Sequence, residues 1–466
     1  MKNKQLLEKI KNSRCAILGF GVSNRPLVTF LRALGTADIT VHDKKPVSAL
    51  GEEAQKLEKS GVRFITGDTY LDEIDADVIF RSPGIRDDAA GIAAAVAKGA
   101  WLTSEMELFF ELTPATIIGI TGSDGKTTTT TLCAKILEEE LAGKRGRVYL
   151  GGNIGEPLLP YVMEMTEADF AVVELSSFQL KTFRKSPARA AITNLSPNHL
   201  DWHVDMAEYI QAKRAVFSHQ NASGRLVLNY DNEITRTFAE DAKGEVLYFS
   251  FRGPVPKGVY LDREGNICVT DGNSVSVLMH RSLIRIIGDH NVENYMAAIA
   301  ATLGHVDYDI IRTVAETFGG VEHRMEFVRE LDGVKWYNDS IASSPTRVIA
   351  GLKAQTQKII MLAGGYDKKI PFEPMVPYVL EKVKYLILTG ATAEKIRDAI
   401  VSHPDYDPTS LTIEMSPSWD YAIDRARQVA QKGDVVSLSP ACASFDCFEN
   451  FEVRGEYYKN RVRSFT

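Results

Sequence analysis

Short apolar runs alternate with amphipathic segments along most of the chain. Runs rich in Val, Ile, Leu and Ala are typical of buried strands in a parallel sheet, and the longer stretches between them carry helical periodicity. Strands that alternate with helices predict an α/β fold, in which the loops that follow the strands gather at one edge of each sheet. The runs that predict strands are 15–18, 38–41, 77–80, 117–120, 170–175, 190–193, 334–337, 358–362, 385–388 and 435–438.

The chain is too long for one hydrophobic core. With 466 residues, it should form about three domains of roughly 150 residues each. We expect domains at 1–104, 105–320 and 321–466, with Gly319 and Gly320 as a hinge before the third. No internal repeat or low-complexity tract interrupts this division.

Composition narrows the class of protein. Hydrophobic residues make up 44% and charged residues 25%, as in a globular protein with large cores. The net charge of −7 argues against a general nucleic-acid or anionic-membrane binder. No stretch approaches the roughly 18 apolar residues of a membrane span, and the N-terminus lacks the apolar core of a signal peptide. We expect a cytoplasmic protein whose scattered cysteines are buried, reduced thiols: Cys15, Cys133, Cys268, Cys442 and Cys447.

A glycine-rich turn follows the predicted strand 117–120. Gly122 and Gly125 let backbone N–H groups close on an anion, and the following helix start adds partial positive charge. Lys126 would reach the terminal phosphates, while the Thr127 hydroxyl would bind Mg²⁺. The turn is one residue longer than an ordinary P-loop, so a glycine turn before a plain helix is the alternative. We favour a nucleoside triphosphate site.

The first predicted strand also leads into a glycine turn. Gly19-Phe20-Gly21 is followed about 20 residues later by Asp43, as in dinucleotide-binding βαβ units. Asn24 stands where the third glycine of that pattern belongs, so a nicotinamide site is one alternative only.

Polar residues follow the strands of the central segment. Glu174, near a strand's carboxyl end, could hold Mg²⁺ as a hard oxygen ligand. His199 follows the next strand. Lys213 falls on an apolar helical stripe with Ile210 and Phe217, where a lysine either snorkels to solvent or has a special role.

Two amides and several strand ends complete the candidate chemistry. Asn291 and Asn294 lie on one helical face and could bind an adenine edge, although a polar first helical turn would look the same. Asp339 and Lys368 follow strands of the last segment, and the sheet edge at which they would meet would also carry Arg324.

The residue sequences of these motifs resemble those of the Mur ligase family, the ATP-dependent amide-forming enzymes of peptidoglycan assembly. The resemblance covers all three domains, and its last motifs are most similar to the D-glutamate-adding members. It rests on residues 121–128, Glu174-Leu175-Ser176-Ser177-Phe178-Gln179, His290-Asn291 with Asn294, Ser82-Pro83-Gly84-Ile85, Ser439 to Asp446, and Asn450-Phe451-Glu452 with Arg454-Gly455.

The resemblance implies a fold and an activity. The fold would be an N-terminal Rossmann-like UDP-binding domain, a central P-loop ATPase-like domain with a parallel sheet, and a C-terminal Rossmann-like domain. The activity would be a C–N ligase that joins D-glutamate to UDP-N-acetylmuramoyl-L-alanine through an acyl phosphate, using ATP and two Mg²⁺ sites. Such an enzyme serves cell-wall biogenesis, cell shape and cell division. It is expected to be a monomer without nucleic-acid partners.

The resemblance also implies roles for individual residues. Lys126, His199 and Lys213 would be catalytic, with Lys213 carbamylated. Metal ligands would be Thr127, Glu174, His199 and carbamylated Lys213. ATP would contact Gly122, Ser123, Asp124, Gly125, Lys126, Thr127, Thr128, Asn291, Asn294, Arg324 and Asp339. The UDP substrate would contact Val22, Ser23, Asp43, Lys44, Ser82, Pro83, Gly84 and Asn153. D-Glutamate would contact Ser343, Lys368, Ser444 and Phe451.

Two motifs depart from the residue pattern of the family. Ile341 stands where a lysine is frequent, which removes a cation, and Ser343 replaces a threonine but keeps a hydroxyl. Asn198 precedes His199 where some members have aspartate, which affects how the histidine would be oriented.

Alternative functions remain at this stage. They are another ligase of this family, a folate-extending glutamate ligase, a nicotinamide oxidoreductase and a nucleotide-binding protein without catalysis.

Overall fold

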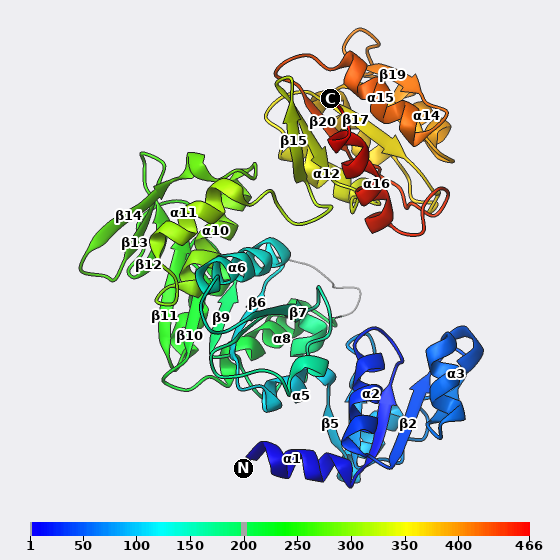
Figure 1. The fold of residues 1–466 in the computed structure, drawn as a ribbon, viewed down its shortest axis with the longest axis vertical. Helices are drawn as coiled ribbons and strands as arrows, with labels where there is room; N and C mark the ends of the chain where they lie inside the picture. Colours follow the sequence, from blue (N-terminus) through cyan, green and yellow to red (C-terminus); the bar gives the residue numbers. More distant parts are fainter. Residues whose placement is uncertain (1, 197–202) are drawn as a thin grey trace. The chain divides into compact units, whose positions relative to one another are not determined.

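The computed structural model describes residues 2–196 and 203–466. The chain divides into two compact units, which are described separately. The first unit contains 1–281 and 292–314, and the second contains 282–291 and 315–466. The first unit holds two sheets and the second holds one (Figure 1). The expected α/β class is confirmed, whereas the domain boundaries at 104 and 320 stay predictions.

The first sheet is entirely parallel, with strand order β3-β2-β1-β4-β5. Because β1 has neighbours on both sides, the loops after β1, β2 and β4 meet at one edge, where open α/β sheets bind ligands. The elements are α1 (Lys2–Lys11), β1 (Arg14–Leu18), α2 (Asn24–Leu34), β2 (Asp38–Asp43), α3 (Glu52–Lys59), β3 (Arg63–Thr66), β4 (Val78–Arg81), α4 (Ala90–Ala97) and β5 (Trp101–Thr103).

The second sheet has nine strands, in the order β14-β13-β12-β11-β10-β9-β6-β8-β7. The pairs from β7 to β12 are parallel, and β6 lies between β8 and β9. Its first elements are α5 (Glu105–Leu112), β6 (Thr116–Thr121), α6 (Lys126–Leu141), β7 (Val148–Gly152), the 3₁₀ turn η2 (Leu159–Tyr161), β8 (Phe170–Glu174), α7 (Ser177–Leu180), β9 (Arg189–Ile192), α8 (Met206–Ser218), β10 (Arg225–Asn229), α9 (Glu233–Thr237) and β11 (Glu245–Ser250).

An antiparallel extension at the edge of this sheet was not expected from the sequence. The pairs β12–β13 and β13–β14 are antiparallel. Four of the six residues of β14 are exposed, so its apolar signal is weak, and the pattern of buried parallel strands does not detect it. These elements are β12 (Gly258–Leu261), β13 (Asn266–Thr270) and β14 (Val275–His280), followed by α10 (Asp289–Thr302) and α11 (Tyr308–Thr317).

The third sheet has the order β15-β16-β20-β17-β18-β19. Only its edge pair β15–β16 is antiparallel among the pairs described; the others are parallel, as predicted. The elements are β15 (Glu326–Leu331), β16 (Val334–Asn338), α12 (Pro345–Lys353), β17 (Ile359–Gly364), α13 (Val376–Lys382), β18 (Val383–Thr389), α14 (Ala393–Val401), β19 (Thr412–Met415), α15 (Trp419–Val429), β20 (Val435–Leu438) and α16 (Phe451–Arg463).

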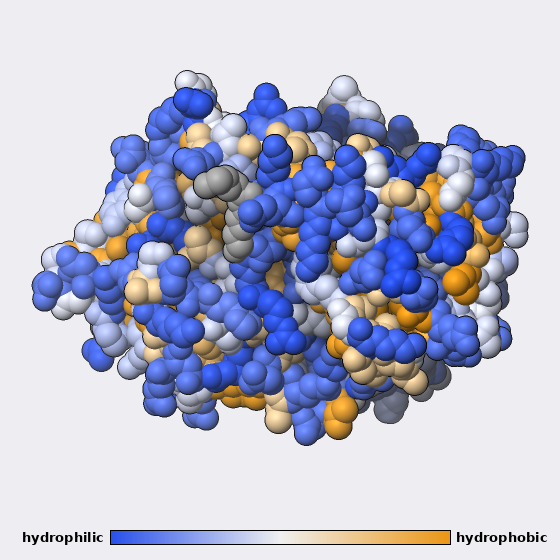
Figure 2. All heavy atoms as spheres, turned by 90° about the horizontal axis from the view of Figure 1, so that it is seen from below, coloured by the Kyte–Doolittle hydropathy of each residue, from blue (hydrophilic) through white to orange (hydrophobic). Residues whose placement is uncertain are grey.

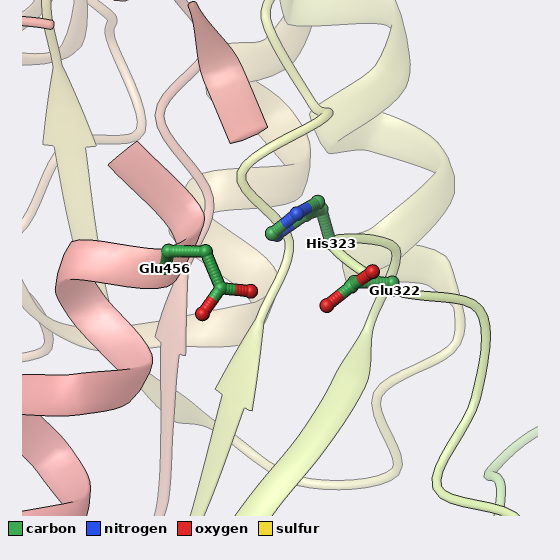
Figure 3. A group of neighbouring side chains, drawn as sticks. All are labelled: Glu322, His323 and Glu456. Atoms are coloured by element: carbon green, nitrogen blue, oxygen red, sulfur yellow. The ribbon is translucent and has the colours of Figure 1, made fainter. Parts of the chain in front are cut away.

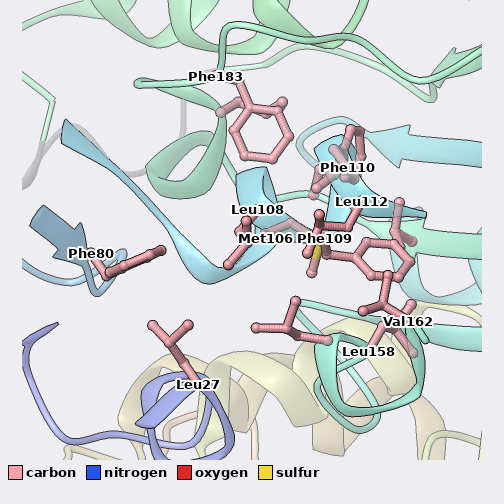
Figure 4. Packing of buried hydrophobic residues seen from close by; sticks show 14 of the residues in the cluster. Leu27, Phe80, Met106, Leu108, Phe109, Phe110, Leu112, Leu158, Val162 and Phe183 are labelled. Carbon is pink, nitrogen blue, oxygen red and sulfur yellow. The ribbon is translucent and has the colours of Figure 1, made fainter. Parts of the chain in front are cut away.

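One apolar core joins the first two sheets. Helix α5 is buried along nearly its whole length. Figure 4 shows its side chains packed with apolar residues from the elements around the first sheet and around the second. The Phe110 ring lies edge-on to Phe183, with ring centroids 5.1 Å apart. Leu27 of α2 and Leu158 before η2 belong to the same cluster. The linker between the two sheets is therefore a structural helix and not a loose connection.

Glu105 is a carboxyl buried within that linker helix. It is 3% exposed and accepts a hydrogen bond from the Leu159 N–H at 3.3 Å. Burial raises its pKa from 4.5 to about 7. Between these values only the folded state keeps the proton, so the free energy of unfolding falls as the pH rises through this window, by roughly 3 kcal/mol in total.

Glu105→Gln should remove this penalty. We expect a higher melting temperature than the unaltered protein at pH 8 and little difference at pH 5, measured by thermal unfolding. Burial also raises the pKa of Glu107 to about 7, so part of the pH dependence of the unfolding free energy should remain in the variant. Exposed Glu139→Gln is the matched control. A variant that melts lower at pH 8 would contradict the burial argument.

The surface and the cysteines complete the fold. Hydrophilic residues dominate the face in Figure 2, with separate apolar patches between them. Within the described residues, no helix is both long and apolar enough to cross a bilayer. The five cysteines are free, but Cys447 is exposed, so the expectation that all of them are buried was wrong. The loop that carries Cys447 follows β20 at the surface, which its sequence alone did not reveal.

Candidate active site

The predicted phosphate loop connects β6 to α6, and Lys126 is the first residue of that helix. Gly122 has φ +147° and Gly125 has φ +78°, both in the region that favours glycine. A Cβ at Gly122 would lie 1.9 Å from Thr193 Oγ1, and one at Gly125 would lie 2.2 Å from Asn294 Oδ1. Both glycines are therefore required by the turn's shape and by its neighbours.

Asn194, after β9, and Tyr209 of α8 hold this turn in place. Asn194 Oδ1 accepts a hydrogen bond from the Asp124 N–H at 2.9 Å, and Ser123 N–H donates to the Asn194 carbonyl at 2.9 Å. Ser123 Oγ lies 3.0 Å from Tyr209 Oη. Lys126 Nζ donates to the Ser123 carbonyl at 2.8 Å, so the ammonium folds back over the loop it follows.

Two of the predicted magnesium ligands, Thr127 and Glu174, lie together beside this turn. Thr127 Oγ1 donates to Glu174 Oε2 at 2.8 Å, and Asn153 Nδ2 donates to Glu174 Oε1 at 2.9 Å. Glu174 ends β8, the direct neighbour of β6, and is 2% exposed. A buried carboxylate next to a hydroxyl at a helix start suits Mg²⁺. Asn153, predicted for the UDP substrate, contacts the carboxylate in this arrangement.

Lys213 is buried with its ammonium group. It is 1% exposed, and Nζ donates to the Gly122 carbonyl at 2.8 Å and to Thr121 Oγ1 at 3.1 Å. Burial, reinforced by the charge of Lys126, holds its pKa well below 10.5. The snorkelling alternative is therefore wrong, because the amine points at the phosphate loop and not at solvent. An amine that is easily deprotonated at this place is nucleophilic.

His199 lies outside the described residues, and its predicted role is not tested. A second histidine, His203, was not singled out by the sequence. Its side chain is buried, its Nε2 lies 2.9 Å from Ser177 Oγ, and its ring stacks on Phe178 at 5.8 Å. Its sequence signal was only its place before a helix.

In the first sheet the predicted UDP-binding residues meet at one edge. Ser82 N–H donates to the Leu18 carbonyl at 2.9 Å, which joins the loops after β4 and β1. Asp43 Oδ2 accepts from the Phe20 N–H at 2.7 Å. Asn24 is buried, and its Nδ2 donates to the Gly19 carbonyl at 2.9 Å, so this side chain closes the turn where a third glycine was missing. Val22 is 74% exposed beside it.

The second unit brings the remaining predicted residues to its own sheet edge. Lys368 Nζ lies 3.5 Å from Ser343 Oγ, and both were predicted to bind D-glutamate. Buried Asp339 accepts from the Met325 N–H at 3.1 Å, and burial raises its pKa to about 7. Arg347 Nη1 donates to the Ile341 carbonyl at 2.9 Å, which places a cation next to the position that lacks the family's lysine.

Arg454, noted in the sequence only as part of a motif, fastens this edge. It is 1% exposed and donates to Ser340 Oγ at 3.0 Å, to the Cys442 carbonyl at 3.1 Å and to the Ala443 carbonyl at 3.2 Å. One guanidinium thus connects the loop after β16 with the loop that contains Ser444.

Glu322, His323 and Glu456 converge elsewhere in the second unit, as Figure 3 shows. Their ligand atoms lie within 4.8 Å of one another, a spacing that could hold a metal ion. However, Lys459 Nζ lies 2.6 Å from Glu322 Oε1 and 2.6 Å from Glu456 Oε1. The ammonium already pairs with both carboxylates, so we interpret the group as an ion-pair cluster.

Comparison with known proteins agrees with this geometry. The Mur ligase middle domain matches residues 120–302, and the "Mur ligase, glutamate ligase domain" matches 323–442. The UDP-N-acetylmuramoylalanine--D-glutamate ligase of Acetivibrio thermocellus is 49% identical over 98% of this chain and 97% of its own length. The chain belongs to the Mur ligase family. The ligase of the same name from Clostridium kluyveri is 48% identical over 97% of both chains.

The fold of this Mur ligase also matches solved structures. The UDP-N-acetylmuramate-alanine ligase of Thermotoga maritima is 16% identical, with a TM-score of 0.53 over 97% of this chain and 100% of that one. The family and the three-domain α/β architecture expected from the motifs are confirmed. The nicotinamide oxidoreductase alternative is rejected, because the family is one of ligases. The roles of single residues in this Mur ligase stay predictions.

Proposed function

We propose that this Mur ligase joins the amine of D-glutamate to the alanyl carboxylate of UDP-N-acetylmuramoyl-L-alanine at the expense of ATP. The observation that carries the proposal is the convergence of Lys126, Thr127, Glu174 and Lys213 at the carboxyl end of β6. Relatives of nearly the same length that are named for this reaction support it.

The ATP phosphates would bind on the β6–α6 turn. Its N–H groups and the start of α6 face the anion, and Lys126 spreads the charge that develops on the γ-phosphate. Thr127 and Glu174 would hold one Mg²⁺, and Mg²⁺ supplies charge neutralisation across the phosphates when bound. Asn291 and Asn294 would bind adenine, and Arg324 with Asp339 would complete the nucleotide site.

The acceptor carboxylate needs its own positive site. Carbamylation of Lys213 would convert its amine into a carboxylate-like group, which with His199 would hold a second Mg²⁺. A carbamate nitrogen keeps one N–H, so one of the two hydrogen bonds of Lys213 would persist. The UDP part would lie on the loops of the first sheet that carry Val22, Asp43 and Ser82.

The chemistry proceeds in two balanced steps. The alanyl carboxylate attacks the γ-phosphorus, ADP leaves, and an acyl phosphate forms. The amine of D-glutamate, whose carboxylates would be held by Lys368, Ser343, Ser444 and Phe451, then attacks the acyl carbon. Phosphate leaves with the bonding electron pair, the amine loses a proton, and an amide remains. Exclusion of water would protect the acyl phosphate from hydrolysis.

The remaining assignments are part of the same proposal. We place the substrate-binding, ATP-binding and amino-acid-binding functions in residues 1–104, 105–320 and 321–466. We propose that the enzyme acts as a monomer in the cytoplasm, and a solution mass near 51.6 kDa would support the monomer.

A phosphate-release assay tests the function. With UDP-N-acetylmuramoyl-L-alanine, ATP and Mg²⁺, we expect phosphate release only when D-glutamate is added, with L-glutamate nearly inactive. The product should carry one amide-linked glutamate by mass spectrometry. Activity with another amino acid would indicate a different ligase of the family, and activity with a folate would indicate the folate alternative. Phosphate release without either co-substrate would contradict the proposal.

A further inference from the structure

Arg81 is a buried cation that the proposed chemistry does not use. It ends β4, it is 1% exposed, and it immediately precedes the Ser82–Ile85 loop. Burial lowers the pKa of its guanidinium, so the position is costly for a charge. The hydrogen bonds that Arg81 donates must therefore offset the cost of burying its charge.

Those hydrogen bonds point in two directions. On one side, Nη1 donates to the carbonyls of Pro83 at 3.2 Å and of Ile85 at 2.5 Å, within the loop of the first sheet. On the other side, Nη2 donates to the Phe178 carbonyl at 3.0 Å and to Thr182 Oγ1 at 3.4 Å. Both partners of Nη2 belong to the region that surrounds the second sheet.

The second set of partners leads directly to the candidate active site. Phe178 lies in α7, the helix that begins three residues after Glu174. From α7 the contacts continue through His203, which lies against Ser177, and Tyr209 to Ser123 in the phosphate loop. Thr182 also donates to Glu107 of the linker helix α5 at 3.3 Å. Arg81 therefore contacts the substrate loop, the helix after Glu174 and, through Thr182, the linker.

We propose that Arg81 is a positioning residue that fixes the distance between the UDP-binding loop that carries Ser82 and the phosphate-transfer site. The inference rests on the proposed function, which places the UDP part of the substrate on the loops that carry Val22, Asp43 and Ser82. The substrate has a set length between its diphosphate and its alanyl carboxylate. The two binding sites must therefore keep a set separation, because a displacement of about 1 Å can cost about 10²-fold in rate.

The planar fork of arginine suits this task. Its two terminal nitrogens lie in one rigid plane and donate to carbonyls on both sides at once, a fixed geometry that the single nitrogen of a lysine ammonium does not reproduce. Arg81→Met should leave the UDP-binding loop and the phosphate-transfer site intact, but the distance between them should vary more. Arg81→Lys retains the charge but replaces the planar fork with one donor nitrogen on a shorter side chain, so it should resemble the methionine variant more than the unaltered protein.

The test measures binding and turnover in the full chain. The affinity of UDP-N-acetylmuramoyl-L-alanine is determined by calorimetry with and without the β,γ-imido analogue of ATP and Mg²⁺, and UDP alone serves as a probe of the first sheet. For the unaltered protein we expect the ATP analogue to tighten substrate binding at least about fivefold. For Arg81→Met we expect this factor to fall to about one and kcat to fall about 10²-fold, with UDP affinity within about threefold. Arg63→Met, an exposed arginine of the same sheet paired with Asp38, is the matched control and should change neither quantity.

Several outcomes would overturn the inference. The first is an Arg81→Met protein whose coupling factor and kcat both stay within threefold of those of the unaltered protein. The second is an equal loss of affinity for UDP and for the substrate while the coupling factor is unchanged. That result would mean that Arg81 stabilises only the structure of its own loop. Absence of coupling in the unaltered protein would overturn it as well. If Arg81→Met does not fold, Arg81→Lys decides by the same numbers. A protein that does not bind UDP-N-acetylmuramoyl-L-alanine at all would instead contradict the proposed function.

Discussion

Replacing Lys126 with alanine is expected to lower ATP-dependent turnover by about 10³-fold or more, because in the proposed function this ammonium would be the cation that the phosphate loop presents to the γ-phosphate. In the structure it leads α6 and folds over the Ser123 carbonyl. Alanine is a good helix former, so the fold should survive the change. Phosphate release under saturating substrates measures the effect, and the melting temperature checks the fold.

The helix itself provides a control for this prediction. Lys135 lies on α6 with its side chain 57% exposed and paired with Glu138, so Lys135→Ala should retain near-normal activity. If Lys126→Ala also retained a near-normal rate, the phosphate-loop assignment would be wrong.

Replacing Lys213 with alanine is expected to lower turnover by about 10²–10³-fold, with partial recovery when a small carboxylate such as acetate or formate is added. The buried amine lies against Gly122 and Thr121, and its lowered pKa leaves it nucleophilic toward CO₂. Loss of a charged metal ligand removes several kcal/mol of charge stabilisation, or about 10²–10³-fold in rate. An added carboxylate would restore the missing oxygens within the cavity that alanine leaves.

The carbamate can also be observed directly. With ¹³C-labelled bicarbonate, the unaltered protein should show a carbamate carbon resonance that Lys213→Ala lacks. Lys213→Arg keeps a positive charge but cannot provide the carboxylate-like group, so it should be inactive. Full activity of Lys213→Arg would refute carbamylation.

Local sequence located many of the buried strands, such as β1, β6, β8 and β20, and the glycine turn between β6 and α6. Gly122, Gly125 and Lys126 form a recognisable unit because one turn and one helix start determine its geometry. The same reasoning left Lys213 open between solvent and core, because helical periodicity indicates a face but not what covers it. Only the packing of the helix against β6 showed that the amine is buried.

Long-range partners could not be predicted from the sequence. Arg81 and Phe178 are 97 residues apart, and Lys459 and Glu322 are 137 residues apart. No local pattern specifies such pairs, since they arise from the arrangement of whole elements. The edge strand β14 was missed for a different reason, which is that four of its six residues are exposed and it lacks a continuous buried apolar run.

The apolar core shared by the first two sheets limits how this chain can be divided. Cutting after residue 104 would uncover apolar side chains of α5 and of the segment around Leu158, which now pack in one cluster with those of α2. An isolated central fragment would expose a large apolar surface and would tend to self-associate. Functional modules and independently folding pieces therefore need not coincide in this enzyme, and recombination between relatives should keep both sheets from one parent.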